Sequence, residues 1–285
     1  MKDEQQPLEN MLKSFYLTTF ARNYNDFAKR SEKQKLGHVE YLLQLAHAER
    51  DERLTKRTAR LLKQAKLPQG KKLDEFNFSK QPGLSLARLN ELAQGDCLDN
   101  CENILLIGEP GTGKTHLSVA LGREWCMRGR RVLYTTAAAL VQQLLINKRD
   151  LTLNPFIKDL DKYEALIIDD ISYIPQTRDE TDVLFVLLAE RYETRSVVIT
   201  SNLVFSQWNS IFKDAMTTKA AIDRLVHHST ILELLGPSGR CTDAMLRQTT
   251  QKTAAGDKQP EPNAKTISSN ETLNASRSKS TKPRI

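Results

Sequence analysis

The chain has 285 residues, a net charge of +7 and a pI near 9.2, so it leans toward anionic partners. Apolar residues make up 39% of it and charged residues 27%, a composition that can fill a core and cover a surface. No apolar run approaches the ~20 residues of a membrane span, and the polar start Met1-Lys-Asp-Glu-Gln-Gln is unlike a secretory signal. We therefore expect a cytoplasmic protein with no membrane partner.

Residues 1–70 are predicted to form a small all-helical domain. Between Glu40 and Ala65, apolar residues recur at spacings compatible with one stripe along a helix. The members of this stripe are Leu42, Leu43, Leu45, Leu54, Leu61, Leu62 and Ala65. The sequence Leu67-Pro-Gln-Gly then breaks the helix and ends the domain.

The segment from Arg53 to Lys72 contains eight basic residues and no acidic one. On the predicted helix, several of these basic side chains share one face. Solvation is the ordinary explanation for such a face, but uncompensated like charges repel one another unless an anionic partner lies nearby. We therefore predict that this helix binds nucleic acid. The predicted contact residues are Arg53, Lys56, Arg57, Arg60 and Lys63.

Residues 71–102 are expected to form a connector that contains a short helix, Leu84–Gln94. Between residues 103 and 250, apolar strands alternate with helices, which predicts an α/β domain with a five-stranded parallel sheet flanked by helices. The predicted strands are Asn103–Gly108, Arg131–Thr136, Glu164–Asp170, Val197–Asn202 and Thr230–Leu235. The predicted helices are 114–128, 137–147, 180–193 and 218–227.

The tail, 251–285, is predicted to be disordered. It has seven basic and three acidic residues, with Pro, Ser, Asn and Thr and almost nothing apolar. Such a segment cannot bury enough apolar surface to fold.

The four cysteines, Cys97, Cys101, Cys126 and Cys241, lack the paired spacing of a zinc site, so we expect reduced thiols. The adjacent His227 and His228 have no companion cysteine or carboxylate cluster in the sequence, which argues against a metal role.

A phosphate-binding pattern follows the first predicted strand. The pattern Gly-x-x-x-x-Gly-Lys-Thr lets backbone N–H groups point at phosphate oxygens, and the next helix adds the positive end of its dipole. Lys114 can reach the β- and γ-phosphates, and the hydroxyl of Thr115 can ligate Mg²⁺. An ordinary turn is the alternative, but the strand-to-helix context favours nucleotide binding. The loop residues are Gly108, Glu109, Pro110, Gly111, Thr112, Gly113, Lys114 and Thr115.

Two further strand ends carry polar residues that suit the same site. Ala165-Leu-Ile-Ile-Asp169-Asp170 resembles a Walker B strand, in which Asp169 would hold Mg²⁺ and Asp170 would act as general base or orient the attacking water. The next strand ends at Asn202, which would lie near Asp169 if the two strands are neighbours. A turn or helix cap is the alternative for Ser201-Asn202.

The segments GEPGTGKT, ALIIDDISY, ERYETRSVVITSNL and AAIDRLVHHS stand in an order that resembles the IstB-type ATPases, the transposition helpers of bacterial insertion sequences. They also resemble the DnaC-type helicase loaders, and both groups belong to the AAA+ class. The resemblance runs from about Leu8 to about Arg247 and includes the amino-terminal helices, which favours the transposition helper.

The resemblance implies roles for matching positions. It makes Asp169 and Asp170 the Walker B acids, Asn202 the sensor-1 residue and Arg224 an arginine finger that completes the site of a neighbouring subunit. Packing or an ion pair with Asp223 is the alternative for Arg224. The chain departs from the AAA+ pattern in having Asp170 where glutamate is usual, and in having too few residues after the last strand for a helical lid. The segment Ser238-Gly239-Arg240 also replaces the Ser-Tyr-Arg of the family.

The resemblance thus implies an ATP- and Mg²⁺-dependent ATPase that forms a homo-oligomer on duplex DNA and assists the transposase of its element in target selection. DNA binding should be largely independent of sequence, because basic helices that contact phosphates read no bases. Two alternatives stay open. One is a DnaC-like helicase loader, and the other is a DNA-bound scaffold that ATP locks with negligible turnover.

Overall fold

The computed structural model describes residues 2–173, 177–208 and 215–238 of the chain. The tail predicted to be disordered, 251–285, lies outside these residues, and so do Gly239, Arg240 and Cys241. Within the described ranges, no helix is both long and apolar enough to cross a membrane.

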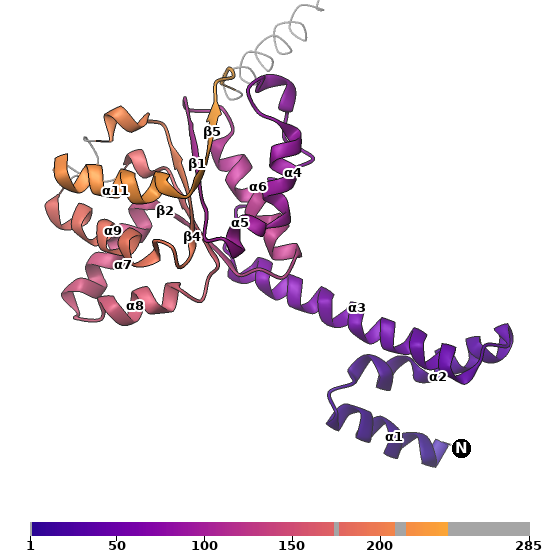
Figure 1. The fold of residues 1–285 in the computed structure, drawn as a ribbon. Coiled ribbons are helices and arrows are strands. Elements are labelled where there is room, and N and C mark those ends of the chain that lie inside the picture. The colour runs from indigo at the N-terminus through magenta and orange to yellow at the C-terminus, as the bar shows by residue number, and fades with distance from the viewer. Residues whose placement is uncertain (1, 174–176, 209–214, 239–285) are drawn as a thin grey trace, which may run out of the picture. The chain divides into compact units, whose positions relative to one another are not determined.

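Three helices open the chain: α1 (Lys2–Ser14), α2 (Thr18–Gln34) and α3 (His38–Gln64) (Figure 1). The first N–H groups of α2 have no partner within that helix, and Glu49 of α3 supplies one. Its carboxylate accepts hydrogen bonds from the backbone of Thr19 (2.8 Å) and Phe20 (3.3 Å), and from Nε of Arg53 (2.6 Å). Burial opposes ionisation of Glu49, but these bonds outweigh it and hold its pKa below the usual range.

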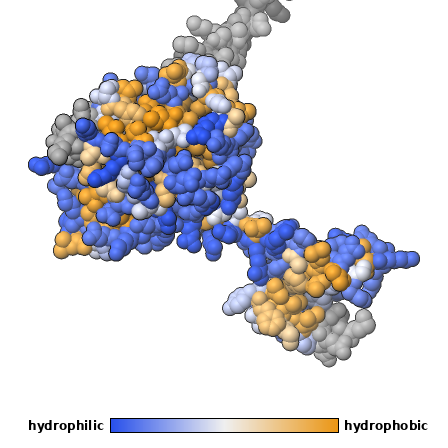
Figure 2. Space-filling view, in the orientation of Figure 1, coloured by the Kyte–Doolittle hydropathy of each residue, from blue (hydrophilic) through white to orange (hydrophobic). Residues whose placement is uncertain are grey.

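The apolar stripe predicted on α3 is buried only in part. Leu45, Leu61 and Ala65 are buried. The members that are more than half exposed are Leu42, Leu43 and Leu54. Figure 2 shows apolar residues gathered on the surface of the amino-terminal helices. These helices therefore bury less apolar area than the sequence pattern predicts.

A connector with the 3-10 turn η1 (Phe78–Lys80) and the helices α4 (Leu86–Gln94) and α5 (Asp96–Asp99) leads into the sheet. The strands are β1 (Asn103–Gly108), β2 (Val132–Thr136), β3 (Ala165–Asp169), β4 (Ser196–Ser201) and β5 (Ser229–Leu234). The helices are α6 (Lys114–Met127), α7 (Ala137–Arg149), α8 (Leu153–Leu160), α9 (Arg178–Arg191) and α11 (Ala215–His227), with 3-10 turns η2 (Ile171–Tyr173) and η3 (Phe205–Gln207).

The strands pair in parallel in the order β2-β3-β4-β1-β5, which confirms the predicted five-stranded sheet. The helix α8 was not predicted. Parallel strands that are covered on both faces have continuous apolar sequences, because the side chains on each face are buried. In β1, Leu105 packs in one core cluster, whereas Ile104 and Leu106 pack in the other. Helices α7, α8, α9 and α11 supply the first cluster, and α3, α4, α5 and α6 supply the second.

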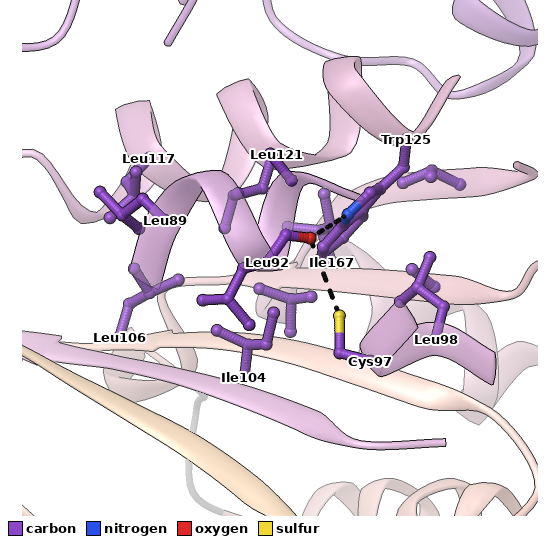
Figure 3. Close-up of a cluster of buried hydrophobic side chains, with 14 of the residues drawn as sticks. Leu89, Leu92, Cys97, Leu98, Ile104, Leu106, Leu117, Leu121, Trp125 and Ile167 are labelled. Carbon is purple, nitrogen blue, oxygen red and sulfur yellow. Dashed lines mark hydrogen bonds between the residues drawn. The ribbon is translucent and has the colours of Figure 1, made fainter. Parts of the chain in front are cut away.

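Figure 3 shows the second cluster, in which Trp125 of α6 and Cys97 of α5 meet at one carbonyl. Trp125 is fully buried, and its indole Nε1 donates to the carbonyl oxygen of Leu92 at 2.8 Å. Cys97 Sγ lies 3.9 Å from the same oxygen. Burial raises the pKa of both Cys97 and Cys126 to about 11, so these thiols stay protonated at neutral pH. Reduced cysteines are confirmed for Cys97, Cys101 and Cys126.

Arg191, at the end of α9, is fully buried and joins three segments of backbone. Its guanidinium donates to the carbonyl oxygens of Leu160 (3.1 Å), Tyr163 (3.0 Å) and Ser196 (3.1 Å). Burial lowers the pKa of Arg191 to about 10, which leaves it charged at neutral pH. The residue thereby ties the ends of α8 and α9 to the start of β4.

Arg191→Met should lower the free energy of unfolding by ~3–5 kcal/mol, because two buried carbonyls and one partly buried carbonyl lose a charged donor. Urea denaturation measures the change. Arg195→Met is the matched control, since the exposed Arg195 also donates to a carbonyl, that of Asp161. The control should cost less than ~1 kcal/mol. Equal losses in the two variants would contradict the structural role given to Arg191.

Candidate nucleotide-binding site

The loop between β1 and α6 has the shape that the phosphate-binding pattern predicts. Gly111 and Gly113 have φ angles of 86° and 103°, a left-handed conformation that side chains disfavour. Gly113 stands directly before the first residue of α6. Phe76 of the connector packs against it so closely that a Cβ at this position would lie 2.8 Å from the ring. The loop therefore leads directly into α6, so that the N-terminus of this helix faces the loop that would bind phosphate.

Lys114 is buried beneath this loop. Its Nζ donates hydrogen bonds to the carbonyl oxygens of Gly108 (2.6 Å) and Glu109 (2.9 Å). The ammonium group is thus held among the residues that would surround a phosphate, at the positive end of the α6 dipole.

Three hydroxyl groups converge on the buried carboxylate of Asp169, at the end of β3. Thr115 Oγ1 donates to Oδ1 at 2.9 Å, and Thr200 Oγ1 of β4 donates to the same oxygen at 2.7 Å. Tyr134 of β2 donates its phenolic O–H to Oδ2 at 2.8 Å. Burial, followed by the contact with Asp169, raises the pKa of Tyr134, so it remains a donor. A hydroxyl and a carboxylate at this distance form a hard oxygen donor set, which fits Mg²⁺.

Asp170 and Asn202 also come together. The carboxylate of Asp170 accepts a hydrogen bond from Asn202 Nδ2 at 3.3 Å, and its backbone N–H donates to Thr200 Oγ1 at 2.8 Å. The strands β3 and β4 are neighbours, as this placement requires. Asp170 has a φ of 61°, an uncommon conformation for a residue with a side chain, and one that tends to occur at functional sites.

Asp170, Asn202 and residues of the phosphate-binding loop line a pocket of about 230 Å³. Its lining residues are Lys71, Pro110, Gly111, Gly113, Lys114, Thr115, His116, Asp170, Thr200 and Asn202. Small-molecule sites usually measure roughly 300–1,000 Å³, so the pocket has the size of the phosphate end of a nucleotide. Lys71, His116, Thr200 and Tyr134 were missed in the sequence. For His116 and Thr200 the only signal was proximity to a motif, Lys71 appeared only as one of the basic residues between Arg53 and Lys72, and Tyr134 had no signal.

The connector packs directly on the loop. His116 Nε2 lies 2.8 Å from the carbonyl oxygen of Lys72, and buried Gln81 donates to the carbonyl oxygen of Thr112 at 2.8 Å. The side-chain Oε1 of Gln81 in turn accepts a hydrogen bond from the backbone N–H of Gly236, just after β5, at 2.9 Å. The connector thus links the phosphate-binding loop to the segment after β5.

Arg224 does not line this pocket. It stands near the end of α11, half-buried, with its guanidinium carbon 5.0 Å from the centre of the Phe185 ring. Leu225 follows Arg224 in the chain. Its carbonyl oxygen accepts a hydrogen bond from the side-chain amide of Asn103, the first residue of β1, at 3.2 Å. The phosphate-binding loop follows the opposite end of β1. At ~3.3 Å per residue, β1 spans roughly 15 Å between these two ends. The backbone beside Arg224 thus lies at the end of β1 away from the loop of its own chain.

The predicted basic residues of α3 differ in their surroundings. Arg53 pairs with Glu49 and donates to the carbonyl oxygen of Tyr16, and Lys56 pairs with Glu52 at 3.0 Å. Arg57 donates to the carbonyl oxygen of Gly129. The prediction of uncompensated charge was therefore wrong for Arg53 and Lys56, because their acidic partners, Glu49 and Glu52, lie just upstream of the basic segment 53–72. Arg60 and Lys63 make no ion pair with a described residue.

The expectation that His227 and His228 have no carboxylate companion was also wrong. Glu193, in the turn after α9, brings Oε1 to 3.4 Å from Nε2 of His228, and Tyr192 hydrogen-bonds Nδ1 of His227 at 2.8 Å. Glu193 and the two histidines offer ligand atoms within 4.8 Å of one another, and all three side chains are exposed. The pattern was invisible in the sequence because Glu193 is remote from the histidines along the chain.

Comparison with known proteins places these features in a family. A family model described as IstB-like ATP binding protein matches residues 10–246. A protein of Sinorhizobium fredii (strain NBRC 101917 / NGR234), named as an insertion sequence ATP-binding protein, is 42% identical over 236 residues, which are 82% of this chain and 79% of the relative. A protein of Pseudomonas aeruginosa, named as the ATP-binding protein of insertion sequence IS21, is 35% identical over 233 residues, 82% of this chain and 88% of the relative.

Among solved structures, domain III of the Thermotoga maritima replication initiation protein DnaA matches with a TM-score of 0.51 and 22% identity, over 68% of this chain and 78% of that one. This likeness shows the shared fold, a parallel sheet with flanking helices.

Proposed function

The chain belongs to the family of IstB-like ATP-binding proteins, and from this premise we propose that it is a Mg²⁺-dependent ATPase that assists transposition. The observation that carries the proposal is the hydrogen-bonded group of Thr115, Asp169 and Thr200, beside Asp170 and Asn202 at the phosphate-binding loop. An ordinary strand-to-helix turn has no need for these groups to converge on one pocket.

Each group has a proposed role in hydrolysis. Lys114 and the loop N–H groups would bind the phosphates, and Thr115 and Asp169 would hold Mg²⁺, which would supply charge neutralisation at the phosphates. Tyr134 and Thr200 fix the orientation of the Asp169 carboxylate, as partners of metal ligands commonly do. Asp170 accepts a proton from the attacking water, and Asn202 orients Asp170.

Arg224 is proposed to act on a neighbouring subunit. It lies toward the wrong end of β1 to reach the phosphates of its own chain. A guanidinium that meets the phosphates of the next subunit would stabilise the charge that develops during transfer. On this proposal, the active form is a homo-oligomer with its ATP sites at subunit interfaces.

The partners that we propose are duplex DNA and the transposase of the same insertion sequence. The names of the relatives refer to insertion sequences, and the amino-terminal helices carry a basic segment. We assign residues 1–70 to DNA or partner binding, 71–102 to a connector, 103–250 to the ATPase domain and 251–285 to a basic tail. ATP binding would control how the assembly holds the DNA that the transposase uses.

Lys114→Ala tests the ATP site. It should weaken ATP binding by roughly 10- to 100-fold, because hydrogen bonds from a charged donor contribute ~1.5–3 kcal/mol. Isothermal titration calorimetry with ATP and Mg²⁺ measures the dissociation constant. Lys148→Ala is the control, since this lysine pairs with Asp179 on the surface. Equal affinity of the Lys114 variant and the wild type would remove the loop from the proposal.

A further inference from the structure

A hollow of about 770 Å³ lies where α3 meets the edge of the ATPase domain. It is lined by six basic residues and by no acidic one among the residues described. They are Arg57, Arg60, Lys63, Lys66, Arg131 and Lys162. The first four come from α3 and its end, whereas Arg131 directly precedes β2 and Lys162 lies shortly before β3. We name these six residues the basic hollow.

Most of the cations in the basic hollow have no partner within the described part of the chain. Arg57 donates to the carbonyl oxygen of Gly129, and Lys162 pairs with Asp159 at 2.9 Å. The remaining four side chains are exposed and make no ion pair or hydrogen bond to any described residue. These four are Arg60, Lys63, Lys66 and Arg131.

Stabilisation of the helix explains only part of this cluster. Basic residues at a helix C-terminus interact well with its dipole, which accounts for Lys63 and Lys66 at the end of α3. It does not account for Arg131 and Lys162, which come from two other segments. Their convergence with the α3 cations gathers positive charge at one place, which costs repulsion unless an anion is bound.

We propose that the basic hollow binds the phosphate backbone of DNA. In this arrangement α3 and the ATPase domain together contact duplex DNA at the edge of the sheet opposite the ATP site. This inference rests on the proposed function, which includes DNA binding, and it changes the contact residues. Arg131, Lys66 and Lys162 join the surface because they line the hollow, while Arg53 and Lys56 leave it because they lie outside its lining.

The chemistry of the lining favours successive phosphates of a duplex. The hollow is larger than one phosphate group, and its cations are spread over three segments of chain. Sites for single-stranded nucleic acid combine cations with aromatic side chains that stack on bases. Here Tyr163 is the single aromatic residue among the described lining, so the hollow is built to meet a backbone rather than exposed bases.

Arg131 and Lys162, the two residues of the basic hollow outside α3 and its end, give the sharpest test. If the DNA surface were confined to α3, their substitution would have no effect on DNA binding. Arg131→Gln with Lys162→Gln, and separately Arg60→Gln with Lys63→Gln, should each weaken binding of a fluorescent mixed-sequence duplex by roughly 10- to 100-fold at moderate salt. Each lost phosphate contact should also reduce the slope of log K against log salt by roughly 0.9. Fluorescence anisotropy of the full chain with ATP and Mg²⁺ measures both quantities.

The matched control removes the same charge elsewhere. Lys148→Gln with Arg149→Gln affects two surface residues that pair with Asp179 and Asp150, and should leave the affinity and the slope close to wild type. If both hollow variants bind DNA as tightly as the wild type does, the inference is overturned while the proposed function stands. Loss of transposase binding with normal DNA binding would also overturn it, in favour of an acidic protein partner. A wild type that binds no DNA would overturn both.

Discussion

Arg224→Ala should bind ATP normally and hydrolyse it at least ~10³-fold more slowly, because arginine fingers contribute 10³–10⁵ to the rate in phosphoryl transfer. Binding should survive because Lys114, Thr115 and Asp169 all lie on the same chain and do not contact Arg224. Calorimetry measures the affinity, and a steady-state phosphate-release assay with duplex DNA measures the rate.

Packing is the competing role for Arg224, since its guanidinium stacks on Phe185 and its Nη1 is buried. Arg224→Met separates the two roles, because methionine keeps an aliphatic stem against the ring but carries no charge. We expect Arg224→Met to melt close to the wild type and to lose hydrolysis as fully as the alanine variant. Normal hydrolysis by the methionine variant would leave Arg224 with a packing role alone.

Asp170→Asn should keep ATP bound and slow hydrolysis by ~10²–10⁴, the usual contribution of a general base. Asn202 can still hydrogen-bond the side chain at this position, and the proposed Mg²⁺ ligands, Thr115 and Asp169, are unchanged. Binding and hydrolysis are measured as for Arg224. Asp179→Asn is the matched control, because this exposed aspartate pairs with Lys148 away from the pocket. Hydrolysis by Asp170→Asn at the wild-type rate would show that another group activates the water.

Most of the sheet could be predicted from the sequence because its strands are continuous apolar runs. The bounds of β1 agree at both ends, and the other four strands differ by a residue or so. The helix α8 was missed because Pro155 lies in its first turn and reads as a breaker, although proline is tolerated there. Amphipathic spacing overstated the burial of α3, since the pattern cannot tell whether a neighbouring element covers the stripe.

The site could be predicted only where its residues belong to a motif. The motifs led to Lys114, Asp169, Asp170 and Asn202, and the structure brings these together at one edge of the sheet. Tyr134 and Thr200 contact Asp169 because of the strand order, which no local pattern contains. Pairing over distance also hid the approach of Glu193 to the two histidines. The acids that neutralise Arg53 and Lys56 are local, each four residues earlier on α3, and were missed because they precede the basic segment.

Mixing two inactive variants shows whether the ATP site is shared between subunits. Arg224→Ala retains an intact phosphate-binding loop, and Lys114→Ala retains an intact arginine. When the two are mixed with ATP, Mg²⁺ and duplex DNA, interfaces of the right orientation pair one intact loop with one intact arginine. We predict that hydrolysis returns in the mixture to a level well above either variant alone. No recovery, with co-assembly of the two variants demonstrated, would contradict a site completed by Arg224 of a neighbouring subunit.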